Sequence, residues 1–338
     1  MKFFELIPHD TKIDFIGKSK YFIVISVTLV LVSLGLIVFR GFNWNVEFAG
    51  GIEMRVELKN RTAPVSIDEI RRVMNNLPAD IAVRGVQVNT FDLQDRNVFS
   101  IRAKGPDASD GSPVDGGFDL NILAKRIEQH LQQLFGEGNV ALISMDMIGP
   151  RVGATLRANA LYAILFSLVG ILIYIGFRFN FRFAPGGIVA LAHDVIITAG
   201  FFAITGREMS LSVLAALLTI AGYSINDTIV IFDRIREQSQ HRKKTLSIGE
   251  YVNKAINETL SRTILTSLTT MMAIVPLLIF GGEILFDFAL AMLIGCTAGV
   301  YSTIFVASPI YVGLERLYAR RPSPHAVHYG STAQAKNF

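Results

Sequence analysis

Six long apolar runs constrain this chain more than any other feature of its sequence. They cover about residues 21–40, 158–177, 185–205, 210–232, 263–281 and 285–312. A hydrocarbon core about 30 Å thick requires roughly 20 apolar helical residues per crossing, and the runs have that length. The hydrophobic content of 51% and the mean hydropathy of +0.43 are too high for a soluble domain with an ordinary charged surface. The sequence therefore predicts six transmembrane helices.

Lysine and arginine residues in the short connections set the expected orientation. They gather at residues 1–20, 178–182, 234–244 and 313–338. The opposite connections, 206–209 and 281–283, contain only Arg207. Because connections rich in Lys and Arg stay on the cytoplasmic side, both termini are expected to be cytoplasmic. The net charge of +4 then reflects topology, and no nucleic-acid partner is expected.

Residues 43–150 have short amphipathic elements in place of a long apolar run. Side chains that alternate between apolar and polar predict strands, and apolar side chains three or four residues apart predict helices. The expected elements are strand 52–58, helix 66–77, strands 86–90 and 97–103, helix 120–134 and strand 139–145. Their β-α-β-β-α-β order is the split βαβ or ferredoxin-like arrangement.

The predicted fold class is a membrane all-α bundle of six transmembrane helices with an inserted periplasmic α+β domain of ferredoxin-like type. The first helix occupies 21–40, the inserted domain 43–150 and the other five helices 158–312. Turn-forming residues at 104–117 predict a mobile loop, and the tail after Pro322 is expected to be disordered.

Sites for metals, cofactors or covalent chemistry are not expected from this sequence. It contains one cysteine, Cys296, inside an apolar run, which excludes a disulfide framework and a cysteine metal cluster. His193 and Asp194 are adjacent, and adjacent side chains on a helix point about 100° apart, which argues against a shared metal. The chain is therefore predicted to be no enzyme and to use no metal.

Ionisable residues inside the apolar runs are the best candidates for function. An ionised side chain near the bilayer centre costs about 2.5 to 3.5 kcal/mol, so such residues usually line an interior path. Asp194, Asp227 and Arg262 meet this description. Polar residues on three consecutive helices predict a common interior seam; those on the fourth helix are Thr219, Gly222, Tyr223, Asn226 and Asp227. Two simpler readings stay open, since hydrogen bonds and an ion pair can merely hold helices together and Arg262 can extend to the interface.

Six short motifs follow one another along the chain. They are N-W-N-V-E-F-A-G-G (43–51), I-G-P-R-V-G (148–153), L-A-H-D-V-I-I-T (191–198), G-Y-S-I-N-D-T-I-V-I-F-D-R-I-R-E (222–237), T-L-S-R-T-I-L-T-S (259–267) and F-D-F-A-L-A-M-L-I-G (286–295). In this order they resemble the motifs of the SecF family. SecF is the smaller subunit of the SecDF protein-export accessory complex, in the resistance-nodulation-division superfamily. The resemblance extends from about residue 10 to residue 316.

The motif after the first apolar run departs from the family pattern at one position. The family usually has Asp where this chain has Glu47, so the acid is kept but its side chain is longer by one methylene group. Gly50 and Gly51 are kept, and glycine suits a chain that turns sharply from the membrane into a strand. Gly222 belongs to the fourth-helix motif. These four residues are predicted to be structural.

The resemblance implies a proton-motive-force-dependent accessory subunit of the Sec protein translocase in the bacterial inner membrane. The implied partners are SecD, the SecYEG translocon and emerging exported polypeptides, with YajC as a further candidate. A proton gradient takes the place of a cofactor. Asp227 and Arg262 match positions proposed for the family's proton path, and Asn226 occupies the place of the SecD acid in the equivalent helix. We expect Asp227 and Arg262 to form a switchable pair, with Asp194 as a further proton-path candidate.

Two other functions are compatible with the sequence. One is half of a proton-coupled exporter of small molecules or lipids from the same superfamily, although such pumps carry larger extracytoplasmic regions than residues 43–150. The other is a scaffold that organises a translocon without conducting protons, which follows if the polar residues in the helices serve packing alone.

Overall fold

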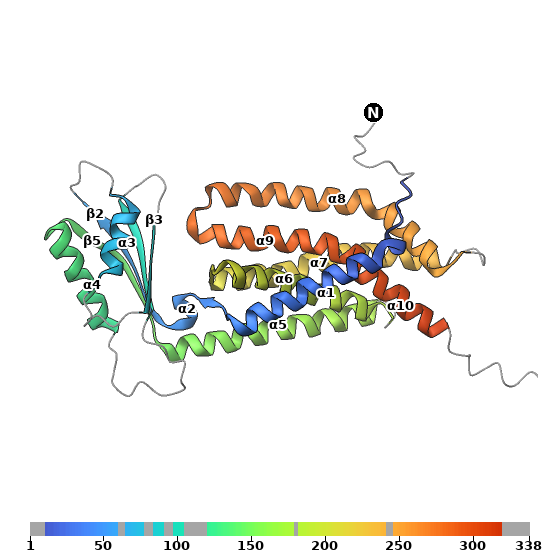
Figure 1. Cartoon of the computed structure of the whole chain (residues 1–338), viewed down its shortest axis with the longest axis horizontal. Coiled ribbons are helices and arrows are strands. Elements are labelled where there is room, and N and C mark those ends of the chain that lie inside the picture. The colour runs from blue at the N-terminus through green and yellow to red at the C-terminus, as the bar shows by residue number, and fades with distance from the viewer. Residues whose placement is uncertain are drawn as a thin grey trace, which may run out of the picture.

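The fold was examined in a computed structural model that describes residues 11–59, 65–77, 84–90, 97–104, 120–178, 182–240 and 246–319. The expected mobile loop at 104–117, apart from Lys104, and the expected disordered tail after Pro322 lie outside the described residues. The described chain forms a bundle of long helices with a small unit of strands and helices at one end (Figure 1).

Six helical segments are long and apolar enough to cross a membrane, as the sequence predicted. They are α1 (Phe15–Phe39), α5 (Pro150–Arg178), α6 (Ala184–Thr205), α7 (Leu211–Gln240), α8 (Ile248–Phe280) and a composite sixth segment. The sixth consists of α9 (Gly282–Ser302), the π-helical turn η1 (Thr303–Ala307) and α10 (Ser308–Ala319). Several helices extend beyond their apolar runs. The reason is that an apolar run marks only the part of a helix that crosses the bilayer, whereas backbone hydrogen bonds continue the helix past that part. At the start of α8, for example, Ser247 and Glu250 form a capping box outside the apolar run.

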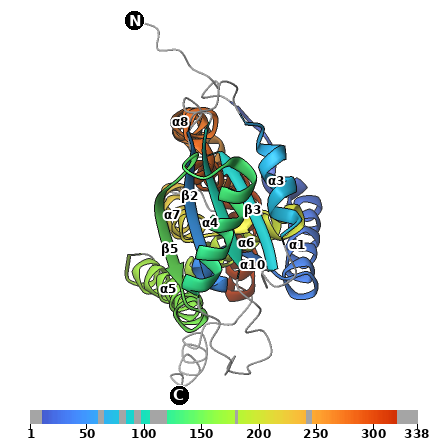
Figure 2. The same cartoon turned by 90° about the vertical axis from the view of Figure 1, so that its left-hand side faces the viewer.

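The unit at the end of the bundle is a four-stranded sheet with two helices. Its elements are β2 (Gly51–Leu58), α3 (Ile67–Asn75), β3 (Arg84–Thr90), β4 (Val98–Lys104), α4 (Leu120–Phe135) and β5 (Val140–Ile148). The strands lie in the order β3-β4-β2-β5, and each neighbouring pair is antiparallel. Helix α4 lies on the side of the sheet that faces away from the bundle (Figure 2). We refer to these elements as the sheet unit.

The alternation of side chains along β2 gives the sheet two unlike faces. Ile52, Met54 and Val56 are buried in a core that also contains Ile127 of α4. Glu53 lies on the opposite face, where it meets Arg102 of β4. The apolar face of the sheet is therefore covered by its own helices, whereas the polar face is available to the bundle.

A short connection that the sequence analysis did not predict links the sheet unit to the bundle. Strand β1 (Asn43–Trp44) pairs in parallel with β6 (Glu208–Met209), and α2 (Val46–Ala49) follows β1. Gly50 and Gly51 then adopt φ values of 80° and 151°. Such values favour glycine, and they turn the chain from α2 into β2 as expected.

Packing within the bundle leaves two helices largely uncovered. In the sixth segment Gly295 and Gly299 bring α9 against Ile220 and Ser224 of α7, so the G-x-x-x-G spacing serves close contact. By contrast, α1 and α5 expose most of their apolar side chains. Lipid or partner helices must cover these surfaces in the membrane. The start of α1 and the end of α10 lie at the end of the bundle away from the sheet unit (Figure 1).

Candidate functional site

Asp194 is the most completely enclosed acid in the described bundle. Its side chain has 0% exposure. Its Oδ2 accepts hydrogen bonds from Ser224 Oγ of α7 at 2.6 Å and from Ser302 Oγ of α9 at 2.8 Å. Its Oδ1 lies 2.9 Å from His193 Nδ1. Because an ionised carboxylate only accepts hydrogen bonds, these contacts suit an ionised Asp194 with the proton of His193 on Nδ1.

His193 completes this cluster from the same helix. Its ring is stacked against Tyr301, with ring centroids 5.9 Å apart. Its Nε2 is buried and has no hydrogen-bond partner within the described part of the chain. His193 and Asp194 are in contact because rotation about the side-chain bonds brings the two groups together despite the angle of about 100° between their Cα–Cβ bonds. The pair can pass a proton between an imidazole and a carboxylate.

The π-helical turn η1 lies next to the Asp194 cluster. Ser302 immediately precedes the turn, and Thr303, its first residue, exchanges a 2.9 Å hydrogen bond with Thr228 of α7. Ser308 Oγ donates to the Thr303 carbonyl at 3.0 Å, which partly satisfies the disturbed backbone. Turns of this type occur mostly at functional positions in helices. The sequence analysis did not find Ser224, Ser302 or this turn, because their contacts with Asp194 join residues far apart in the chain.

Asp227 forms a second and looser cluster. Its side chain is 5% exposed. It accepts hydrogen bonds from Thr266 Oγ1 at 3.4 Å and from Ser267 Oγ at 3.3 Å, both on α8. These distances are long for hydroxyl-to-carboxylate hydrogen bonds. Among the described residues no cation forms an ion pair with this buried acid, so its partners are the two hydroxyl groups of α8.

Arg262 lies one helical turn before Thr266 on α8, and its side chain is exposed. Among the described residues it forms no ion pair with Asp227, although it is close enough to act on that carboxylate electrostatically. The expected direct pair is therefore absent from this conformation. The hydroxyl groups of Thr266 and Ser267, and not the guanidinium, donate hydrogen bonds to the carboxylate oxygens of Asp227.

The polar residues of α7 do not face one common interior seam, which corrects the sequence-based expectation. Asn226 is exposed on the outside of the bundle, as are Gly222 and Thr219 one and two turns earlier. Asp227 points inward toward α8 instead. The reason is the helical rotation of about 100° per residue, which separates neighbours at the edge of a polar stripe. Asn226, Gly222 and Thr219 form an exposed face of α7 that we call the outer polar face, and Arg262 is exposed on the neighbouring helix α8.

Glu47 anchors the connection to the bundle. Its Oε2 accepts a hydrogen bond from the backbone N–H of Leu211, the first residue of α7, at 2.8 Å. An acidic side chain at this position also interacts favourably with the positive end of the helix dipole. The longer side chain of Glu at this position is therefore used as a cap for α7, the helix that carries Asp227.

Charged residues join the polar face of the sheet unit to the bundle. Glu208 of β6 has 7% exposure and lies 3.1 Å from Lys104 Nζ and 3.5 Å from an Arg102 guanidinium nitrogen. Arg102 also pairs with Glu53 at 3.2 Å. Burial raises the pKa of Glu208, against the opposing effects of the Lys104 and Arg102 cations and with a smaller contribution from Asp287. These residues form an interface network that ties the position of the sheet unit to the loop between α6 and α7.

The raised pKa of Glu208 predicts a specific pH dependence. A buried acid with a raised pKa contributes stability that is present below its ordinary pKa of 4.5 and is lost as the pH rises through the raised value. We therefore expect the thermal stability of the wild-type protein to increase relative to Glu208→Gln as the pH is lowered from 7 to about 4.5. Melting curves of both proteins in the same detergent measure this difference. If the difference in thermal stability between the two proteins stays constant or declines as the pH is lowered, the effect of the ion pairs on the pKa outweighs the effect of burial.

Among the described residues, no group of three or more His, Cys, Asp or Glu side chains is arranged to hold a metal ion. Asp194 and Asp227 instead accept hydrogen bonds from hydroxyl groups. This arrangement can accept and release protons.

Comparisons with known proteins place these features in context. Residues 127–317 match the family described as "Protein export membrane protein SecD/SecF, C-terminal". The chain is 38% identical over 320 residues to a protein translocase subunit SecF from Calditerrivibrio nitroreducens, covering 94% of this chain and 99% of the relative. It is 38% identical over 307 residues to a protein translocase subunit SecDF from Thermus thermophilus, covering 90% of this chain and 38% of the relative. A crystal structure of SecDF from the same organism, described as a translocon-associated membrane protein, matches 94% of this chain with a TM-score of 0.73 and 33% identity.

Proposed function

Because the chain belongs to the SecF family of protein translocase subunits and has an accessory role in protein export, we propose that it uses a proton gradient to assist that export. The observation that carries this proposal is the environment of Asp227. The acid is buried between α7 and α8, held by two long hydrogen bonds from hydroxyl groups and joined to no cation among the described residues. An ionisable side chain inside the membrane costs free energy, and a residue that served packing alone would not need one.

Protonation of Asp227 offers a means of moving α7 against α8. As an anion, the carboxylate accepts hydrogen bonds from α8 and attracts the Arg262 guanidinium nearby. Arginine stays protonated at any working pH, so Asp227 is the member that changes charge. One charge that crosses the membrane potential carries about 2.3 kcal/mol per 100 mV, comparable to the cost of rearranging a buried polar contact. We propose that Asp194 with His193 forms a second proton acceptor deeper in the bundle.

The outer polar face supports SecD as the direct partner. An arginine and an asparagine exposed on membrane-spanning helices are costly against lipid, so a partner that presents polar groups is the better cover. In the SecDF relative from Thermus thermophilus, this chain matches 38% of a longer polypeptide. We infer that SecD covers Asn226 and Arg262, and that SecYEG, YajC and emerging polypeptides are contacted through the resulting complex.

We further infer that the sheet unit is a ferredoxin-like domain in the periplasm. Its element order and its antiparallel strand order β3-β4-β2-β5 support this assignment. The Lys and Arg distribution supports cytoplasmic termini in the inner membrane. Glu47 and the interface network of Glu208 tie the sheet unit to α7, so a movement of α7 is transmitted to the domain that faces the emerging chain.

Thiol labelling tests this orientation. A cysteine in place of Gln133, which is exposed on α4, is expected to react with a membrane-impermeant maleimide added to the periplasmic side of intact spheroplasts. Cys296 is buried in the bundle and provides a low background, which Cys296→Ala removes. A matched cysteine in place of Lys254, on the other side of the membrane, should be labelled only after the membrane is broken. The reverse pattern would contradict the proposed topology.

Reconstituted export tests the proposed function. The wild-type chain is co-reconstituted with SecD and SecYEG in proteoliposomes, and the late stages of translocation of a secretory protein are measured with and without an ionophore that collapses the proton gradient. We expect stimulation by this chain to disappear when the gradient is removed. Stimulation of equal size without the gradient would support a non-conducting scaffold instead.

A further inference from the structure

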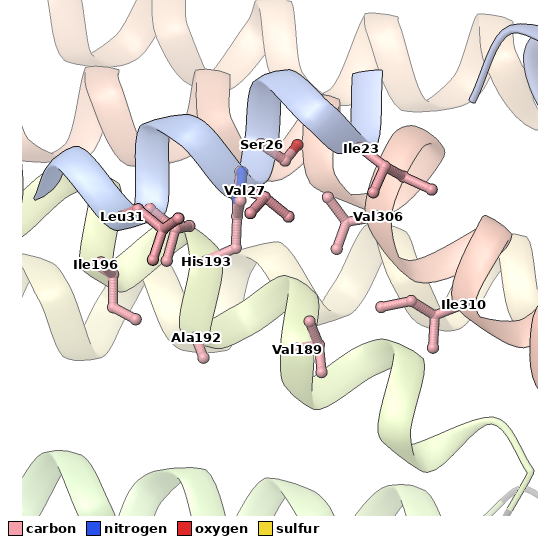
Figure 3. Close-up of a pocket in the computed structure, with 11 residues that line it drawn as sticks. Ile23, Ser26, Val27, Leu31, Val189, Ala192, His193, Ile196, Val306 and Ile310 are labelled. Carbon is pink, nitrogen blue, oxygen red and sulfur yellow. The ribbon is translucent and has the colours of Figure 1, made fainter. Parts of the chain in front are cut away.

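A groove runs along one edge of α1 in the membrane-spanning part of the described chain. It has a volume of about 330 Å³ and lies between α1, α6 and the η1–α10 segment. Figure 3 shows Ile23, Val27 and Leu31 of α1 near Val189 and Ile196 of α6. Of the two polar side chains that line it, Ser26 is hydrogen-bonded to Tyr301 and His193 is hydrogen-bonded to Asp194 through Nδ1, and only the buried His193 Nε2 has no partner among the described residues. The groove therefore offers an apolar surface to a ligand from the bilayer.

A second, polar hollow continues this groove toward the end of the bundle away from the sheet unit. It has a volume of about 600 Å³ and is lined by α1, α8 and α10. Ile23 lines both hollows. At about 100° per residue, Lys20, Ile23, Val27 and Val30 fall within one arc of about 80° on α1. The two hollows thus follow a single edge of this helix.

The acids of the polar hollow have hydrogen-bond partners within the protein, whereas its cations do not pair with described acids. Its two acids serve as caps within the protein, since Asp14 accepts from the Gly17 N–H at 2.8 Å and Glu250 accepts from the Ser247 N–H at 2.7 Å. Its two cations, Lys20 and Arg316, pair with no carboxylate among the described residues, and both are exposed. Two available cations at the mouth of an apolar groove are complementary to an anionic head group attached to a hydrocarbon chain.

We propose that this edge of α1 binds an anionic phospholipid, with an acyl chain in the groove and its phosphate between Lys20 and Arg316. The dimensions agree with one leaflet. From Lys20 to Leu31 the helix rises about 16 Å, close to half of a hydrocarbon core about 30 Å thick. The lipid fills the hollow between α1 and the α10 end of the sixth segment, and so fixes α1 against the π-helical turn that adjoins Asp194.

Photo-crosslinking in lipid nanodiscs tests this site. The protein is reconstituted with phosphatidylglycerol that carries a photoactivatable acyl chain, and crosslinked peptides are mapped by mass spectrometry. We expect crosslinks to concentrate on the groove residues of α1, α6 and α10. An equally labelled phosphatidylcholine probe should crosslink there several times less. Crosslinks spread evenly over the exposed faces of α1 and α5, or equal yields from both probes, would mean ordinary annular lipid only.

Paired variants separate the two parts of the site. Lys20→Ala and Arg316→Ala should each lower the phosphatidylglycerol yield roughly fivefold, as expected for loss of a basic residue near an anionic lipid surface. Lys18→Ala is the control, because Lys18 is exposed on α1 but lines neither hollow. Val27→Trp should block the chain groove, whereas Val24→Trp, at a 65% exposed position outside the groove, should not. Elution at the wild-type position on size exclusion establishes that each variant is folded. If a groove variant and its control give the same yield, the proposed site is wrong.

Discussion

Replacement of Asp227 by Asn is expected to abolish gradient-dependent stimulation of export while leaving an inserted, SecD-associated protein. Asparagine has nearly the same size; its amide oxygen can accept a hydrogen bond from one of the Thr266 and Ser267 hydroxyls and its NH2 group can donate to the other, so the packing of α7 on α8 should persist. It cannot bind and release a proton at working pH. The loss should therefore appear in the coupling to the gradient and not in the amount of protein in the membrane.

The measurement is the ratio of export rates with and without a proton gradient in the reconstituted system. For Asp227→Asn we expect this ratio to fall to the value obtained without the chain. Asp233→Asn is the matched control, because Asp233 is an exposed acid on the same helix and should keep the wild-type ratio. Asp227→Glu keeps the ionisable group and should retain part of the coupling. A wild-type ratio for Asp227→Asn would make Asp227 a packing residue and exclude the proposed proton path.

Replacement of Gly50 by Ala is expected to produce a large loss of stability for a change of a single methyl group. Gly50 has a φ of 80°, and a Cβ atom there would lie 2.8 Å from Pro150 Cα and 2.9 Å from Pro150 N. Both contacts are with backbone atoms at the start of α5, which cannot rotate away. With its ψ of 146° this backbone lies in a region that is essentially restricted to glycine and costs another residue about 1 to 3 kcal/mol, and overpacking typically adds about 1 to 3 kcal/mol.

Thermal unfolding in detergent, combined with limited proteolysis, measures this effect. We expect Gly50→Ala to lower the melting temperature and to expose the connection between α2 and β2 to protease. Gly149→Ala is the control, since Gly149 adjoins Pro150 but a Cβ atom there would meet nothing within 4 Å. That variant should stay within about 0.5 kcal/mol of the wild type. Equal melting temperatures for the two variants would show that the junction rearranges without strain.

The polar interior of the bundle was the least predictable part of the site. The sequence identified Asp194 and Asp227 by their position in apolar runs, because the cost of burying an acid is a property of the residue and its surroundings along the helix. It did not identify Ser224, Ser302 or Ser267, since hydroxyl side chains are common in membrane helices and carry no signal of their own. Their contacts with the two acids are made between helices.

The six spans and the positions of the main strands and helices of the sheet unit could be predicted from the sequence. These features depend on apolar length and on the period of side chains along the chain, both of which are local. Gly50 and Gly51 could also be assigned to a sharp turn, because the need for glycine is a property of the backbone at that residue.

Which polar residues meet depends on the tertiary structure. It turned Asp227 inward to α8 and its neighbour Asn226 outward, and it left Arg262 on the outside of the bundle instead of in a direct pair. It also brought Glu208 of β6 to Arg102 of the sheet unit. The physical reason is that the rotation and depth of each helix are fixed by packing against the others. A shift of a fraction of a helical turn exchanges a buried side chain for an exposed one.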